Sequence, residues 1–77
     1  MLDKVRHIVA DITHNDPAAV NPQSSSDDLN GWDSIAQINI IVAIEEEFGV
    51  TFSAEDLHKL NSVEKITGAL LAMATPQ

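Results

Sequence analysis

The apolar residues at the start of the chain recur at helical spacing. They lie three or four positions apart, with charged residues between them: Leu2, Val5, Val9 and Ile12. This spacing places the apolar side chains on one face of an α-helix. Pro17 and the two polar residues before it favour a helix end. The pattern therefore predicts a first helix over residues 2–14.

The strongest helical pattern covers residues 34–48 and ends at Gly49, a residue that commonly terminates helices. Successive residues of a helix are about 100° apart, so its apolar residues divide between two sides. One side carries no charge and is expected to face the core: Ile40, Ile41, Ile44 and Phe48. The opposite side places apolar residues beside polar and acidic ones: Ile35, Ile38, Val42, Asn39, Glu45 and Glu46. The second side suits a partner surface, although single exposed apolar residues are also common by chance.

Two more helices are predicted after Gly49. Residues 54–60 form a short one, and residues from 63 onward form another, with a single apolar face: Val63, Ile66, Leu70 and Met73. Gly68 lies inside the last helix at a cost of about 1 kcal/mol relative to alanine, for which close packing is one explanation. A short strand over residues 50–52 is the alternative there, but it would have no partner strand.

Polar residues at the predicted helix starts indicate how each helix is capped. Ser34 with Gln37, and Ser53 with Asp56, have the three-residue spacing of a capping box. Asn61 or Ser62 can cap the last helix.

Residues 15–33 have no hydrophobic period and are rich in Asn, Asp, Ser and Pro. So long a loop in a small domain is often functional. Leu29 and Trp32 are expected to hold it against the helices, whereas a disordered linker would not need them. The sequence thus predicts one all-α domain over residues 1–77, a four-helix bundle of three longer helices and one short helix with a long first loop.

Charge and composition narrow the function classes. The chain has 12 acidic and 4 basic residues, a formal net charge of −8, and no cysteine. Nucleic-acid binding needs clustered Lys and Arg, which are missing. Partners with basic patches are favoured, although the acids could also serve solubility alone. No apolar run reaches the roughly 18 residues of a membrane span, and the start does not resemble a signal peptide. We therefore expect a cytoplasmic protein.

Ser34 is the principal candidate for chemistry. It follows Asp33 and opens the strongest helix, and a helix N-terminus offers free amide donors and the positive end of the dipole. A phosphate attached there is well placed. A plain helix-capping serine explains the same position, and in the modified protein Asp33 could take over as the cap. These arguments leave both interpretations open.

The segment Gly31-Trp32-Asp33-Ser34-Ile35 resembles the phosphopantetheine attachment motif of the acyl carrier protein family, an Asp-Ser pair followed by an aliphatic residue. The run Ala43-Ile44-Glu45-Glu46-Glu47-Phe48-Gly49 is similar to the family's second helix, and the likeness covers almost the whole chain. The resemblance implies a non-catalytic carrier, with phosphopantetheine attached to Ser34 by a phosphopantetheinyl transferase that uses coenzyme A and magnesium. Asp33 would help present the serine. The terminal thiol of this phosphopantetheine arm would hold an acyl group as a thioester. The protein itself has no cysteine to supply such a thiol.

The resemblance also implies two sets of contact residues. The first would dock on the transferase and on acyl-transferring and condensing enzymes with basic patches: Ile35, Ile38, Val42, Glu45 and Glu46. The second would line a shelter for the cargo inside the bundle: Ile41, Ile44, Phe52, Leu57 and Leu60. A carrier of this kind is expected to act as a monomer.

Three residues depart from the fatty acid synthase carriers of that family. Ala36 and Asn39 stand where acids are often found, and Trp32 resembles carriers of polyketide or other specialised pathways. We therefore expect a specialised pathway rather than housekeeping fatty acid synthesis. A peptidyl or aminoacyl carrier, and an unmodified acidic interaction module, are the alternatives.

Other constellations are weaker. His7, His14 and His58 lack the spacing of metal ligands, so no metal site is predicted. A hydrolase triad on Ser34 would need a nucleophile elbow, and the glycines that bracket such a serine are missing. The acidic clusters lack the alternating ligand spacing of a calcium loop.

Overall fold

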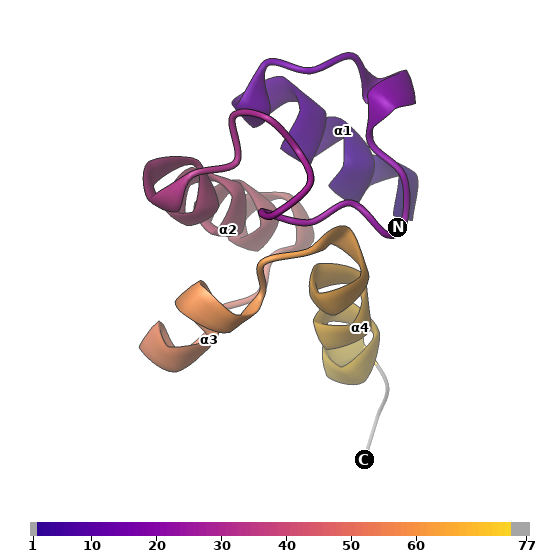
Figure 1. Ribbon diagram of the computed structural model, residues 1–77. Coiled ribbons are helices and arrows are strands. Elements are labelled where there is room, and N and C mark those ends of the chain that lie inside the picture. The colour runs from indigo at the N-terminus through magenta and orange to yellow at the C-terminus, as the bar shows by residue number, and fades with distance from the viewer. Residues whose placement is uncertain (1, 75–77) are drawn as a thin grey trace.

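The computed structural model describes residues 2–74, which form four α-helices and one short 3₁₀-helix. The elements are α1 (Leu2–Thr13), the 3₁₀-helix η1 (Pro17–Ala19), α2 (Ser34–Phe48), α3 (Ala54–Lys59) and α4 (Val63–Ala74). The all-α bundle with three longer helices and one short helix is confirmed. Figure 1 shows the short α3 beside α2 and away from α1, while α1 contacts both α2 and α4. In the described residues, 50–52 form no strand.

The helix ends follow from local side chains. Ser53 caps α3 by accepting a hydrogen bond from the backbone N–H of Asp56 at 3.2 Å, as predicted. Ser62 accepts one from Lys65 at 3.0 Å at the start of α4, so Ser62 rather than Asn61 is the cap. Gly49 ends α2 in the left-handed conformation, with φ +66°.

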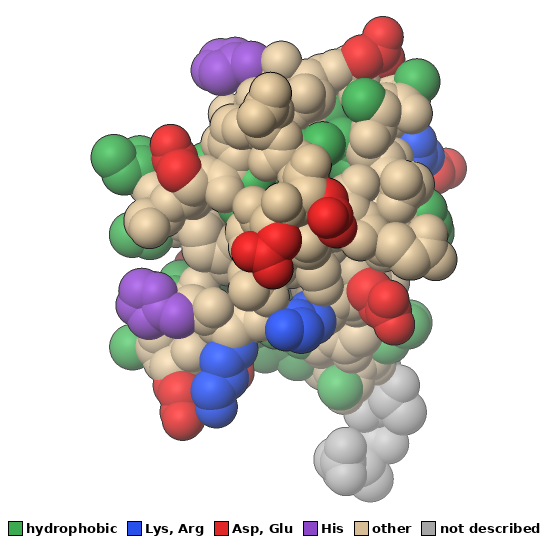
Figure 2. Space-filling model, in the orientation of Figure 1, with side chains coloured by type: hydrophobic (Ala, Val, Ile, Leu, Met, Phe, Trp, Pro, Cys, Tyr) green, Lys and Arg blue, Asp and Glu red, His purple; other side chains and the backbone are tan. Residues whose placement is uncertain are grey.

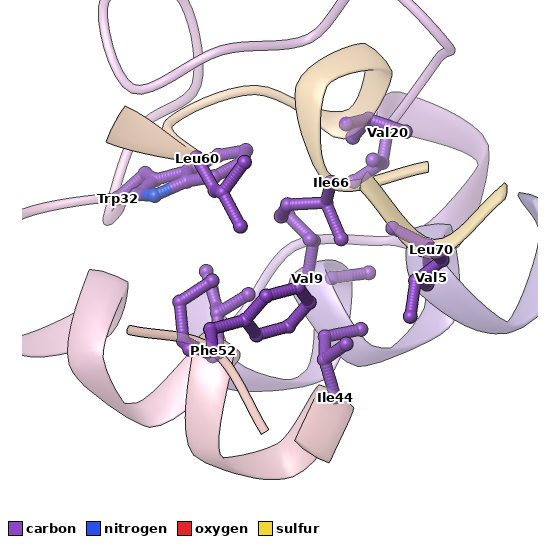
Figure 3. Packing of buried hydrophobic residues seen from close by; sticks show 13 residues of the cluster. Val5, Val9, Val20, Trp32, Ile44, Phe52, Leu60, Ile66 and Leu70 are labelled. Carbon is purple, nitrogen blue, oxygen red and sulfur yellow. The ribbon is translucent and has the colours of Figure 1, made fainter. Parts of the chain in front are cut away.

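The core draws on all four helices or their immediate ends. Its fully buried members include Val5 and Val9 of α1, Ile44 of α2 and Ile66 of α4. Figure 3 shows Trp32 and Leu60 at one end of this cluster and Val5 and Leu70 at the other. Met73 was predicted to join the apolar face of α4, but 46% of it is exposed. Met73 is the residue before the last one of α4, where helical spacing alone does not ensure burial.

The long loop between α1 and α2 is ordered by contacts at three places. Arg6 of α1 donates to the carbonyl oxygens of Val20, at 2.6 Å, and Pro17, at 2.9 Å. An isolated antiparallel bridge joins Ser25 to Ser62, just before α4. Trp32 is buried and Leu29 packs against the core, as predicted. These contacts exclude the disordered-linker interpretation and fix the path of the chain into α2.

Gly31 allows the loop to turn into α2 against the end of α1. Its φ is +88°, and a Cβ at this position would lie 2.5 Å from the backbone oxygen of Thr13. The left-handed backbone alone costs about 1–3 kcal/mol for a residue other than glycine. We therefore expect Gly31→Ala to lower the free energy of unfolding by about 2 kcal/mol or more, measured by urea denaturation.

Gly68 is the control for Gly31, because alanine at Gly68 is expected to have the opposite effect on stability. A Cβ there would meet nothing within 4 Å, so close packing does not explain this glycine. Gly68→Ala is expected to raise the free energy of unfolding by roughly 0.5–1 kcal/mol, because alanine loses less backbone entropy in a helix. Equal stability of the two alanine variants would contradict the assigned role of Gly31.

Candidate functional site

Ser34 is the first residue of α2, and its side chain is exposed. No hydrogen bond joins its hydroxyl to another residue in the described part of the chain. The first amide groups of a helix have no acceptor within the helix, and the helix dipole places partial positive charge there. An exposed hydroxyl beside amides that can bind an anion fits the attachment of a phosphodiester.

Asp33, not Ser34, caps the helix. The Oδ1 atom of Asp33 accepts a hydrogen bond from the backbone N–H of Ala36 at 2.8 Å, and the backbone of Asp33 is extended. The predicted capping box of Ser34 and Gln37 is therefore wrong. Ser34 lies one position inside the helix, where its side chain is not needed to satisfy an amide. The fold thus leaves the Ser34 hydroxyl available, because its neighbour performs the capping.

The cap can be tested without altering Ser34. Asp33→Ala is expected to lower the free energy of unfolding by about 1 kcal/mol, because an amide of the first turn loses its acceptor. Asp33→Asn retains a side-chain oxygen of the same geometry and should stay within a few tenths of a kcal/mol of the wild type. Urea denaturation of the three proteins at one pH measures the difference, and an equal loss in both variants would assign the effect to charge rather than to capping.

A pocket of about 290 Å³ lies next to Ser34. Its walls come from the loop, the start of α2, the end of α3 and the link to α4: Ser26, Trp32, Asp33, Ser34, Gln37, His58 and Asn61. Six of these seven side chains are polar. None of the five predicted cargo-lining residues lines this pocket.

Those five residues form part of the packed core instead. Ile41 and Ile44 are completely buried, Phe52 and Leu60 are more than nine-tenths buried, and Leu57 packs against the same cluster. They lie together, as a shared lining requires, but in this structure they contact one another and the rest of the core. Their role as a cargo lining remains a prediction.

Gln37 is a site residue whose place the sequence reasoning missed. Its Oε1 accepts a hydrogen bond from the indole Nε1 of Trp32 at 2.6 Å. Its Nε2 donates to the carbonyl oxygens of Leu57 and Leu60, each at 2.8 Å. The signal was its spacing: Gln37 precedes Ile41 and Ile44 by four and seven positions, on the stripe that faces the core. A buried polar residue on such a stripe must find partners.

The predicted partner residues have unequal exposure. Ile35, Ile38 and Val42 are 73%, 45% and 44% exposed, on the side of α2 opposite to Ile40 and Ile44. Figure 2 shows hydrophobic side chains protruding beside α2, and acidic side chains spread over the rest of that face.

The two acids of the predicted surface, Glu45 and Glu46, also differ in exposure. Glu46 is exposed, whereas Glu45 is partly buried, and its Oε2 accepts a hydrogen bond from the backbone N–H of Phe52 at 2.8 Å. Glu45 thus stabilises the segment that follows α2, and Glu46 is the acid that is freely presented.

Two absences complete the description. Among residues 2–74, no three His, Cys, Asp or Glu side chains gather where they could hold a metal ion. In the same part of the chain, no helix has the length and apolarity needed to cross a membrane.

Comparisons with known proteins agree on one family. The family model described as "Phosphopantetheine attachment site" matches residues 3–70. The acyl carrier protein of Thermosynechococcus vestitus is 43% identical over 67 residues, which cover 86% of this chain and 82% of that protein. The acyl carrier protein of Solidesulfovibrio magneticus is 40% identical over 62 residues, which cover 80% of each chain. Both relatives bear the name of a carrier.

Proposed function

Since the chain belongs to the acyl carrier protein family, whose members bear a covalent phosphopantetheine, we propose that Ser34 is the attachment residue. The observation that supports this most is the exposed Ser34 hydroxyl at the start of α2, left free by the Asp33 cap. The chain has no cysteine, so the thiol that carries the acyl group as a thioester comes with the arm. The protein acts as a tether for substrates of other enzymes, not as a catalyst.

The attachment step follows from the chemistry of the serine. The Ser34 Oγ forms a bond to the phosphorus that carries the pantetheine of coenzyme A, and adenosine 3′,5′-bisphosphate leaves. The hydroxyl proton passes to a base of the phosphopantetheinyl transferase, and magnesium in that enzyme neutralises the phosphates. The amides of the first turn of α2 stabilise the negative phosphodiester that remains on the carrier.

The exposed side of α2 is proposed to dock the transferase and the acyl-transferring and condensing enzymes. Ile35, Ile38 and Val42 provide apolar contacts next to Ser34, and Glu46 provides the charge that attracts a basic patch. Glu45 contributes to the same field while it holds Phe52. Association should therefore weaken as salt is added, because screening reduces the attraction between exposed charges.

We further propose that the carrier serves a specialised pathway. Asn39 is exposed and neutral, and Ala36 is buried, so the first turns of α2 carry no acid after Asp33. Partners that need a strongly acidic surface near the arm would bind this carrier less well. Residues 1–77 are proposed to work as one carrier domain, as a monomer in the cytoplasm, which suits a protein that must present one helix face to several enzymes in turn.

Intact mass measurement after incubation with coenzyme A and a broad-specificity transferase tests the attachment. The expected result is a gain of one phosphopantetheine, which peptide fragmentation assigns to Ser34. An unchanged mass with an active transferase would overturn the proposal. Offering a panel of acyl- and amino-acid-activating enzymes to the loaded protein separates an acyl carrier from an aminoacyl carrier.

A further inference from the structure

The Gln37 side chain joins three parts of the molecule that surround Ser34. It lies one helical turn after Ser34, and only 7% of it is exposed. It accepts a hydrogen bond from Trp32 of the loop and donates to the carbonyl groups of Leu57, in α3, and of Leu60, the residue just after α3. A single amide therefore connects the loop, α2 and α3 through three hydrogen bonds, which we call the Gln37 network.

The Gln37 network lies between Ser34 and the apolar core. Trp32 and Gln37 both line the pocket beside Ser34, and both are more than nine-tenths buried, so they form its floor. Leu60 belongs to the core cluster behind that floor, and Trp32 belongs to both the floor and the cluster. A chain that enters the core from this pocket must part Trp32, Gln37 and the end of α3, which would leave buried polar groups without partners.

The pocket itself favours polar cargo. Ser26, His58 and Asn61 face it from the loop, from α3 and from the link to α4. Such side chains exchange hydrogen bonds with hydroxyl, amide or carboxylate groups but gain nothing from an alkyl chain. A long alkyl chain without an apolar site stays in water. Each exposed methylene group then raises the free energy of the loaded carrier.

We propose, on the basis of the function proposed above, that this carrier displays short or polar acyl groups outside the bundle. The Gln37 network is the element that keeps aliphatic chains out of the core. Gln37 is thus a specificity-determining residue: it acts on the choice of cargo through the position of α3, not through contact with a reacting atom.

Isoleucine methyl NMR of the loaded carrier tests this inference. The transferase is supplied with acetyl-coenzyme A or octanoyl-coenzyme A, and mass measurement confirms that each product is fully loaded. In the wild type, the Ile41 and Ile44 methyl signals are expected to coincide for the two cargoes. In Gln37→Met, which keeps the side-chain volume but loses all three hydrogen bonds, octanoyl loading is expected to shift these signals. The octanoyl thioester of the variant should also hydrolyse several-fold more slowly than that of the wild type.

Two further variants test which hydrogen bonds of the Gln37 network keep the octanoyl chain out of the core. Gln37→Glu retains an acceptor for Trp32 but cannot donate to Leu57 and Leu60, so it should behave like Gln37→Met. Trp32→Phe removes the indole donor and part of the ring that forms the pocket floor, so octanoyl loading is expected to shift the Ile41 and Ile44 signals in this variant too. Octanoyl-dependent shifts of Ile41 and Ile44 in the wild type would overturn the inference, even if a variant failed to fold. Since loading is verified separately by mass, failure of attachment at Ser34 is distinguishable from entry of the chain into the core.

Discussion

Ser34→Ala is expected to abolish phosphopantetheine loading while leaving the fold intact. Alanine has no oxygen with which to displace adenosine 3′,5′-bisphosphate, so the loss should be complete rather than partial. The side chain is exposed and the Asp33 cap does not depend on it. Alanine is also a better helix former, so the free energy of unfolding should not fall. Intact mass after incubation with coenzyme A and the transferase measures the loading.

Ser26→Ala is the matched control for that experiment. Ser26 lines the same pocket from the loop, but it does not open a helix. Its variant should gain one phosphopantetheine at the wild-type rate to within about twofold, a difference of less than 0.5 kcal/mol in barrier. A mass gain that persists in Ser34→Ala would place the attachment elsewhere and would remove the basis of the proposed function.

The second large effect concerns two isoleucines of the same helix. Ile44 is completely buried, so Ile44→Ala should lower the free energy of unfolding by about 2–5 kcal/mol. A domain of this size has few kcal/mol to lose, and a large part of the variant should unfold near 37 °C. Ile38 is 45% exposed on the opposite side, and Ile38→Ala should cost less than about 1 kcal/mol. Urea denaturation of both variants measures the contrast.

For affinity to the transferase, the order of these two variants should be the reverse of their order in stability, with Ile38→Ala losing more than Ile44→Ala. Ile38→Ala removes an exposed apolar contact next to Ser34, and we expect transferase affinity to fall roughly tenfold, or about 1.4 kcal/mol. Ile44→Ala, assayed at a temperature where it is folded, should retain wild-type affinity. Calorimetric titration with a catalytically inactive transferase separates the two effects. Equal affinity of Ile38→Ala and the wild type would contradict the proposed partner surface.

Much of the fold could be predicted from spacing alone. The bounds of α2, the burial of Ile40, Ile41 and Ile44, and the exposure of Ile38 and Val42 all follow from the helical period of residues 34–48. The prediction of burial failed at Met73, which has the expected helical spacing but is half exposed near the end of α4. Spacing also failed where two adjacent residues can both cap, as at Asp33 and Ser34, because it cannot decide which side chain meets the free amide.

By itself the sequence determined the helices, the separation of the two sides of α2, and the position of Ser34 at a helix start. These features depend on residue order, since helical periodicity and capping act over three or four neighbouring positions. Only the tertiary structure decided what Gln37 bonds to, that Gly31 lies against Thr13, and that Glu45 holds Phe52. Those contacts join residues that are 7 to 23 positions apart, beyond the three or four positions over which helical spacing and capping act, so they depend on how the helices and loops pack.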